Sequence, residues 1–146
     1  MVQRRRRTGR KFVANATNSP APILDDGQRE LPSPTWNQVR AAIVQLDPEG
    51  HNFVRYGNLD ALGKQSKDAY MIVQKRADGR CLVVVQEGRR NFYLVKRQKN
   101  HGEAVVKTNG VPNVHPLSRF HGMRGVLKAA KVYFESGVKE PHFCWE

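Results

Sequence analysis

The last 26 residues, 121–146, constrain the fold of this chain more than any other stretch. Gly137 stands where a left-handed residue commonly ends a helix, and Pro141 prevents the helix from restarting. The tail that follows ends in Phe143, Cys144 and Trp145, which are costly to leave in water. We therefore predict a docked extended tail. Before Gly137, apolar residues recur at helical spacing and predict one buried helix stripe: Met123, Val126, Leu127, Ala130 and Phe134.

Three apolar stretches in the middle of the chain predict neighbouring strands of a meander. They cover residues 70–73, 81–85 and 91–95. An Asp78-Gly79 pair marks the first turn, and the second turn contains Gly88. Residues 104–106 are expected to continue the same sheet, and residues 114–120 to lead into the last helix.

A second helix is predicted before the meander. Thr35 followed three residues later by Gln38 has the spacing of a capping box. Residues 51–56 then predict a first strand, followed by a polar connection over residues 57–67. Four apolar residues fall on one face of this helix: Trp36, Val39, Ile43 and Leu46.

Strands in one run, with a helix on each side of that run, predict an α+β fold. We expect an antiparallel meander of about five strands flanked by an N-terminal and a C-terminal helix. Residues 34–146 would form this single domain. Its structural anchors would be Trp36, Phe134, Gly137 and Trp145.

The formal net charge of +12 is concentrated at the N-terminal end. Residues 1–33 combine a basic block with three prolines and few core-forming residues, so we predict a disordered basic leader. Such a block is attracted to nucleic acid through release of counterions, without reading its sequence. The block consists of Arg4, Arg5, Arg6, Arg7, Arg10 and Lys11.

The location and redox state follow from what the sequence lacks. It has no apolar run of the roughly 18 residues that a membrane span needs. No apolar segment follows the arginine block, as a secretion signal would require. The two cysteines, Cys81 and Cys144, have neither disulfide nor metal-site spacing. We expect a cytoplasmic protein with reduced thiols and no membrane partner.

No catalytic constellation emerges from the sequence. The five histidines (residues 51, 101, 115, 121 and 142) do not have the spacing of a metal-ligand set. The carboxylates are scattered, and no glycine-rich phosphate loop precedes a helix. We therefore expect a protein that is not an enzyme and has no cofactor and no metal.

Basic residues interleaved with aromatic ones leave open a nucleic-acid-binding function. Arg89, Arg90 and residues 96–99 lie near Phe92 and Tyr93. Cations beside exposed rings suit single-stranded nucleic acid, whose bases stack on aromatic side chains. Strand alternation lets one of the two rings point outward. This alternative combines the basic loops with the arginine block.

Short motifs spread over residues 34–146 follow one another in a characteristic order. They are Trp36-Asn37-Gln38-Val39, Tyr70-Met71-Ile72, Gly79-Arg80, Leu82-Val83-Val84, Asn91-Phe92-Tyr93-Leu94, Leu127-Lys128-Ala129-Ala130, Tyr133-Phe134, Gly137, Pro141 and Trp145-Glu146. On these residues the chain resembles the Imm1 family of immunity proteins of bacterial polymorphic toxin systems.

The resemblance implies a non-catalytic protein that covers a cognate toxin domain and blocks access to its active site. The basic domain would suit an acidic toxin surface, since charge complementarity sets association rate and partner choice. The residues predicted to contact the partner lie in basic turns: Lys75, Arg76, Arg89, Arg90, Arg97 and Lys99.

Overall fold

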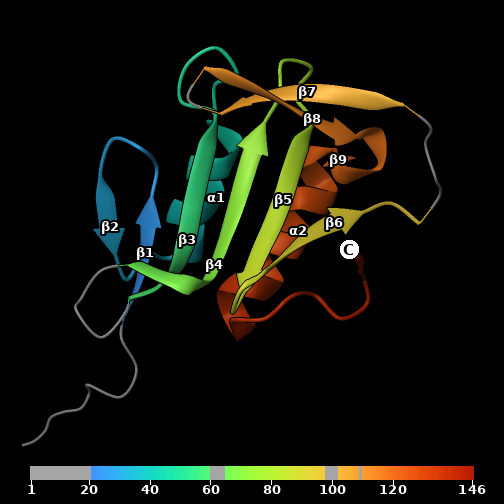
Figure 1. Cartoon of the computed structure of the whole chain (residues 1–146). Coiled ribbons are helices and arrows are strands. Elements are labelled where there is room, and N and C mark those ends of the chain that lie inside the picture. Colours follow the sequence, from blue (N-terminus) through green and yellow to red (C-terminus); the bar gives the residue numbers. More distant parts are fainter. Residues whose placement is uncertain (1–20, 60–64, 98–101, 109) are drawn as a thin grey trace, which may run out of the picture.

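The computed structural model describes residues 21–59, 65–97, 102–108 and 110–146. This part of the chain forms two α-helices, an antiparallel sheet of eight strands and a separate two-stranded ribbon (Figure 1). The predicted α+β class is confirmed. The sheet is larger than the five or so strands that the sequence predicts.

The large sheet follows the order β10-β6-β5-β4-β3-β1-β2, with β9 paired to β5 beside this path. The predicted meander is its centre, β3 to β6, in which each strand pairs with its sequence neighbour. The bounds are β1 Pro22–Asp25, β2 Glu30–Pro32, β3 Phe53–Leu59, β4 Gln65–Lys75, β5 Cys81–Glu87, β6 Arg90–Val95, β9 Phe120–His121 and β10 Cys144–Trp145.

The predicted leader is wrong in its second part. Residues 22–25 and 30–32 form the β1–β2 hairpin, which extends the sheet beside β3. Leu24 is buried in the core, and Pro22 and Pro32 occupy strand ends, where a missing N–H is tolerated. The boundary predicted at residue 34 therefore moves to residue 21 or earlier, and residues 1–20 lie outside the described residues.

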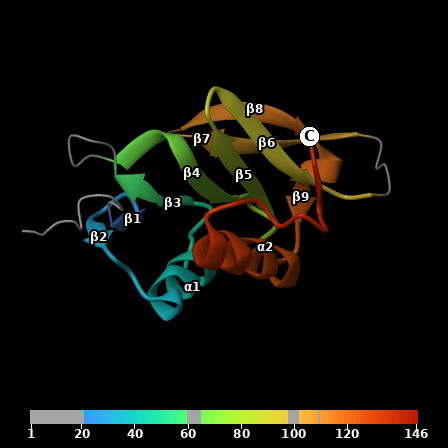
Figure 2. The same ribbon diagram turned by 90° about the horizontal axis from the view of Figure 1, so that it is seen from below.

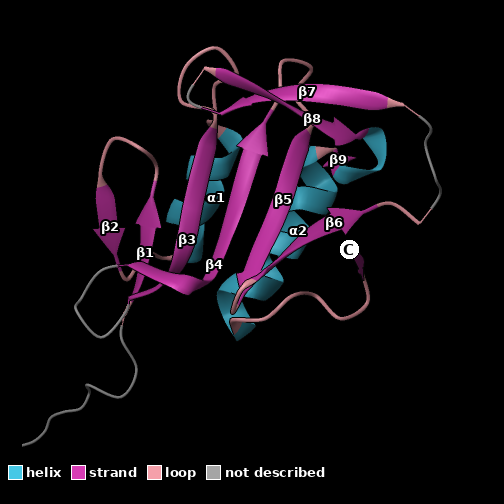
Figure 3. Cartoon of the chain, viewed as in Figure 1, coloured by secondary structure: helices cyan, strands magenta, loops and turns pink. Residues whose placement is uncertain are grey.

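The two helices pack on one face of the sheet, as Figure 3 shows. Helix α1 (Trp36–Val44) begins with the predicted capping box, in which Thr35 accepts from the Gln38 backbone and Gln38 accepts from the Thr35 backbone. Helix α2 (Met123–Ser136) ends at Gly137, whose φ of 75° is left-handed. The N–H of Gly137 donates to the carbonyl of Tyr133 at 2.8 Å, which closes the last turn.

The ribbon consists of β7 (Glu103–Thr108) and β8 (Val111–Pro116) and lies across the opposite face of the sheet (Figure 2). The prediction that residues 104–106 continue the large sheet is therefore wrong. The short 3-10 turn η2 (Leu117–Arg119) and β9 lead from the ribbon to α2. The predicted polar connection 57–67 is also too long, because β3 continues to Leu59 and β4 begins at Gln65.

Two apolar cores result from this three-layer arrangement. The larger lies between the helices and the sheet and includes Val39, Ile43, Met71 and Val85. The smaller lies between the sheet and the ribbon, where Leu82 and Val84 of β5 pack against Ala104, Val106 and Phe120. Alternate residues of β5 thus enter different cores, so its continuous apolar run reflects burial on both faces.

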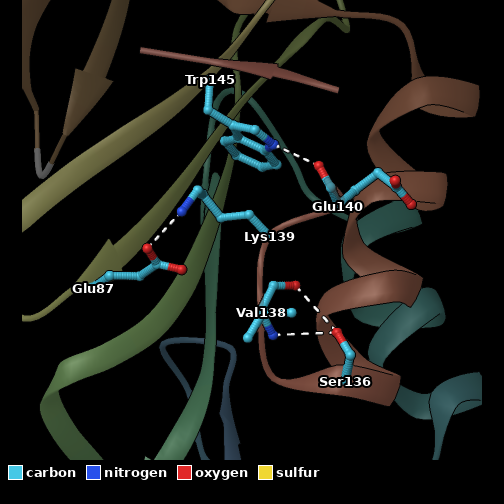
Figure 4. A network of polar contacts seen from close by, with 6 residues as sticks. All are labelled: Glu87, Ser136, Val138, Lys139, Glu140 and Trp145. Atoms are coloured by element: carbon cyan, nitrogen blue, oxygen red, sulfur yellow. Dashed lines mark hydrogen bonds and ion pairs between the residues drawn. The ribbon is translucent and has the colours of Figure 1, made fainter. Parts of the chain in front are cut away.

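The tail after α2 is docked on the sheet through both side chains and backbone (Figure 4). The ammonium of Lys139 lies 2.5 Å from the carboxylate of Glu87, and the indole N–H of Trp145 donates to the carbonyl of Glu140 at 2.9 Å. Tyr93 and Glu146 exchange backbone hydrogen bonds of 2.8 and 3.0 Å. Phe143 and Trp145 pack, partly buried, against the larger core.

Candidate interaction surface

The outer side of the ribbon exposes apolar side chains. Val105 and Val114 are direct cross-strand partners and are 49% and 59% exposed, while Val111 at the ribbon's turn is 60% exposed. Among the described residues, the only other exposed large apolar side chains are Val44 and Val138. Because single exposed apolar residues are ordinary and clustered ones are not, the ribbon is the strongest candidate for a binding surface.

The ribbon is held rigidly above the sheet. The buried amide of Gln74 donates to the Lys107 carbonyl at 2.8 Å and to the Thr108 hydroxyl at 2.9 Å. The buried amide of Asn52 donates to the same Lys107 carbonyl at 2.7 Å. Buried amides that have several partners fix the geometry between elements. The ribbon that carries the exposed valines therefore has a fixed position relative to the sheet.

Two arginine side chains lie over aromatic rings beside the ribbon. The Arg119 guanidinium carbon is 3.9 Å from the centre of the Tyr93 ring, and that of Arg76 is 5.0 Å from the centre of the Phe120 ring. Arg119 also donates to Nδ1 of His115 at 3.3 Å, since a guanidinium has no acceptor. Burial, and secondly the Arg119 charge, lower the pKa of His115, so its ring is neutral and can accept.

Few cations of this region are neutralised within the molecule. Residues 65–146 carry fifteen Lys and Arg against seven Asp and Glu. The ion pairs among described residues are Arg29–Asp26, Arg76–Asp78 and Lys139–Glu87. Arg80 is exposed and lines a hollow of about 310 Å³ together with Arg76, Asp78, Leu117 and Phe120. Beside the ribbon, Arg80 and Arg119 thus carry positive charge that no described carboxylate pairs with.

The structure separates the predicted contact residues into three groups. Lys75 and Arg76 lie at the β4–β5 turn beside the ribbon, whereas Arg89 and Arg90 lie at the opposite end of β5. Arg97 follows β6 and donates to the His142 carbonyl of the tail at 3.2 Å. Lys99, like the arginine block at residues 4–11, lies outside the described residues. The predicted residues therefore do not form one patch.

Sequence reasoning missed the ribbon valines and Arg119. A signal was present, because Ala104, Val105 and Val106 place apolar side chains on both faces of one strand. From the sequence, this run is assigned to the large sheet, without an exposed apolar face. In the structure Ala104 and Val106 are buried while Val105 faces outward.

His121 is the most buried histidine of the described residues and lines a hollow of about 160 Å³ with Lys96, Gly125 and Cys144. Its Nε2 is 2.7 Å from the Leu94 carbonyl and donates to it. Burial lowers the pKa of His121, the Leu94 hydrogen bond opposes this effect, and the charges of Lys96 and Arg80 reinforce it. Burial likewise raises the pKa of Cys81 to about 11, so its thiol stays protonated.

Groups of three or more His, Cys, Asp or Glu side chains that could hold a metal do not occur among the described residues. Within the same residues, neither helix is long and apolar enough to cross a membrane.

A scan against models of protein families found no match, and a search of curated proteins found none either. The resemblance to Imm1 immunity proteins therefore stays a prediction.

Proposed function

We propose that this chain is a non-catalytic binding protein that neutralises a toxin domain by covering it, the role that the resemblance to Imm1 proteins implies. The partner would be a protein with an acidic, partly apolar surface, and both would meet in the cytoplasm. The observation that carries the proposal is the rigid ribbon with Val105 and Val114 exposed, beside Arg80 and Arg119, which form no ion pair among the described residues.

This arrangement has the composition of a protein interface. Interfaces combine an apolar centre with a polar rim, and here the valines would be the centre. A preformed ribbon lowers the entropic cost of binding, because its backbone is already ordered by Gln74 and Asn52. Arg76, Arg80 and Arg119 would complement acidic groups of the partner and speed the encounter.

The alternative is binding of single-stranded nucleic acid by the basic loops and the arginine block. Its stacking mechanism requires free ring faces. Arg90 and Lys139 lie 4.7 and 4.1 Å from the centre of the Phe92 ring, and Arg119 covers Tyr93. A base would have to displace these cations before stacking. The geometry therefore favours a protein partner.

The test begins with the open reading frame immediately upstream of this chain's gene, which the proposal expects to end in a toxin domain. Binding of the full chain to that domain is measured by calorimetry, together with inhibition of the toxin. Val114→Asp places a charge in the proposed apolar centre and is expected to weaken binding by about 2 kcal/mol or more, roughly 30-fold in Kd. Val138→Asp is the matched control, because Val138 is 52% exposed and lies in the tail.

Equal Kd values for the two variants would mean that the ribbon is not the interface. A full chain that does not bind the domain, and instead binds a single-stranded oligonucleotide with an affinity that survives physiological salt, would overturn the proposal in favour of the alternative.

A further inference from the structure

The hollow lined by His121 has no role in the proposed function. It measures about 160 Å³ and is called here the His121 hollow. Its walls come from β6, β9, the first turn of α2 and the tail, which lie close together on the right of Figure 1. None of the described residues that line it belongs to the ribbon. The hollow is therefore separate from the proposed interface.

Much of the lining of the His121 hollow is apolar. Leu94, Val95 and Phe143 contribute to it, together with the half-buried Cys144. An apolar cavity of about 150 Å³ is enough to hold a benzene molecule. The His121 hollow therefore has space for one ring or for a branched alkyl group of similar size.

Gly125 leaves one wall of the hollow without a side chain. Glycine is less favourable inside a helix than alanine, so its presence in α2 calls for a reason. A close contact is not the reason, because an added Cβ would meet no atom within 4 Å. Nor is a left-handed backbone, since Gly125 does not have a positive φ. What the glycine provides is open space beside the hollow.

The lining carries cations and no carboxylate. Lys96 and Arg97 line the hollow, and neither forms an ion pair within the described part of the chain. By contrast, the hollow at the β4–β5 turn includes Asp78 beside its arginines. The carboxylate of Glu140, close to the lining in sequence, is buried and accepts from the backbone N–H of His142 at 2.7 Å. The charge of the lining is therefore positive.

The buried His121 ring senses this positive charge. Burial lowers its pKa most, the Leu94 hydrogen bond raises it, and the charges of Lys96 and Arg80 lower it further. The site is also built in advance of any ligand. His121 Nε2 donates to the Leu94 carbonyl at 2.7 Å, and Arg97 donates to the His142 carbonyl of the tail at 3.2 Å. These contacts hold the walls together.

We infer that the His121 hollow binds a small carboxylate that carries one ring or a branched alkyl group. The apolar group lies against Phe143 and beside Gly125, and the carboxylate lies between Lys96 and Arg97. Apolar burial favours entry, and charge-assisted hydrogen bonds orient the ligand. Because the ribbon takes no part in it, this site goes beyond the proposed function and does not depend on it.

The experiment is an NMR titration of the isotopically labelled full chain with sodium benzoate. We expect saturable shifts centred on the backbone amides of Lys96, Gly125 and Cys144, with a Kd of about 1 mM or lower. Benzamide has the ring without the charge, and acetate has the charge without the ring. Both should bind at least about tenfold more weakly than benzoate.

Equal binding of benzamide or of acetate would overturn the inference, because one half of the site would then be unused. The absence of saturable shifts up to about 20 mM benzoate would overturn it as well.

A charge variant tests the cationic part of the lining. Lys96→Gln with Arg97→Gln should weaken benzoate binding about tenfold or more. Lys107→Gln with Lys131→Gln removes the same charge at exposed positions elsewhere and should leave the Kd unchanged. Equal weakening in both pairs would mean attraction to the whole basic molecule and would contradict a built site.

A second variant tests the open wall. Gly125→Leu adds a side chain beside the hollow and should weaken benzoate binding at least about tenfold. Glu135→Leu places the same side chain at an exposed position near the end of α2 and is the matched control. Circular dichroism checks that both variants fold. Unchanged binding by a folded Gly125→Leu variant would contradict the inference.

The thiol of Cys144 locates the bound benzoate. Cys144 lines the hollow and is partly exposed, whereas Cys81 is fully buried and serves as the internal control. Saturating benzoate should slow alkylation of Cys144 by iodoacetamide severalfold, because it covers the thiol and disfavours the thiolate. Mass spectrometry measures the rate. An unchanged rate at saturation would mean that benzoate binds elsewhere, and would overturn the inference.

Discussion

Two glycines of the α2 region should respond oppositely to alanine. Gly125 lies inside the helix, and an added Cβ there has open space around it. Gly125→Ala is therefore expected to raise the free energy of unfolding by about 0.5–1 kcal/mol. Gly137 has a φ of 75°, which is unfavourable for a residue with a Cβ. Gly137→Ala is therefore expected to lower the free energy of unfolding by about 1 kcal/mol. Urea denaturation of both variants measures the two values, and effects of the same sign would contradict this account.

Trp145 tests how firmly the tail is docked. Its ring is partly buried, and its N–H donates to Glu140. Trp145→Ala should therefore cost about 2–3 kcal/mol, less than the 3–5 typical of a fully buried aromatic residue. Val138→Ala, at an exposed position of the same tail, is the control. A loss below about 1 kcal/mol for Trp145→Ala would mean that the tail contributes little to stability.

Local residue signals were the most predictable part of this chain. The Thr35–Gln38 capping box and the Gly137 stop act through neighbouring backbone atoms, so their spacing is sufficient to recognise them. The stacking of Arg119 on Tyr93 joins residues 26 positions apart in sequence, and nothing in either local pattern indicates the contact. Such contacts depend on the packing of η2 against β6.

At the scale of elements, the ribbon depends on two buried amides. Gln74→Ala removes both hydrogen bonds from β4 to the ribbon and should expose the amides of β7 and β8 to faster hydrogen exchange. The backbone amides of the meander should stay protected from hydrogen exchange, because the hydrogen bonds between its strands, such as β4 and β5, are unchanged. Gln86→Ala on β5 is the matched control, since the Gln86 amide donates only to the nearby Gly88 carbonyl. Equal protection of the ribbon in both variants would contradict its anchoring by Gln74.

Periodicity explains which elements were foreseeable. Helix α2 and the strands β4 to β6 have apolar patterns several residues long, which identify them without knowledge of the fold. The β1–β2 hairpin contains only Ile23, Leu24 and Leu31 as large apolar residues between prolines, too few for a period. Its structure depends on pairing with β3, a partner more than 20 residues away.

For the whole molecule, buried titratable groups define the pH range of stability. Burial lowers the pKa of His121 and His115 below 6.5, so the unfolded chain binds more protons and stability falls as pH drops below that value. Burial raises the pKa of Cys81 to about 11 and, with Glu87 and Tyr56, that of Tyr133 to about 12. Their ionisation in the unfolded chain lowers stability above about pH 9.

We therefore expect the highest free energy of unfolding between about pH 7 and 9, measured by urea denaturation across the pH range. Proton NMR titration of the His121 ring checks the acidic side. A His121 pKa at or above 6.5 would contradict the structural account.

Net charge was the least informative property read from the sequence as a whole. The value of +12 describes the whole chain, but it hides the net charge of −2 carried by residues 21–59. Only the fold brings Asp26 and Asp47 to the same hollow, because the hairpin folds beside α1.

The large sheet ends in strands that are poor templates for growth. On one side the edge is β2, three residues long and ending in Pro32, which has no N–H to donate. On the other side the six-residue strand β6 is covered by the two-residue strand β10 and by the backbone of Glu146. Short and proline-bearing edges hinder strand-by-strand addition of further molecules. A concentrated solution of this protein should therefore resist conversion into cross-β filaments while its tail stays in place.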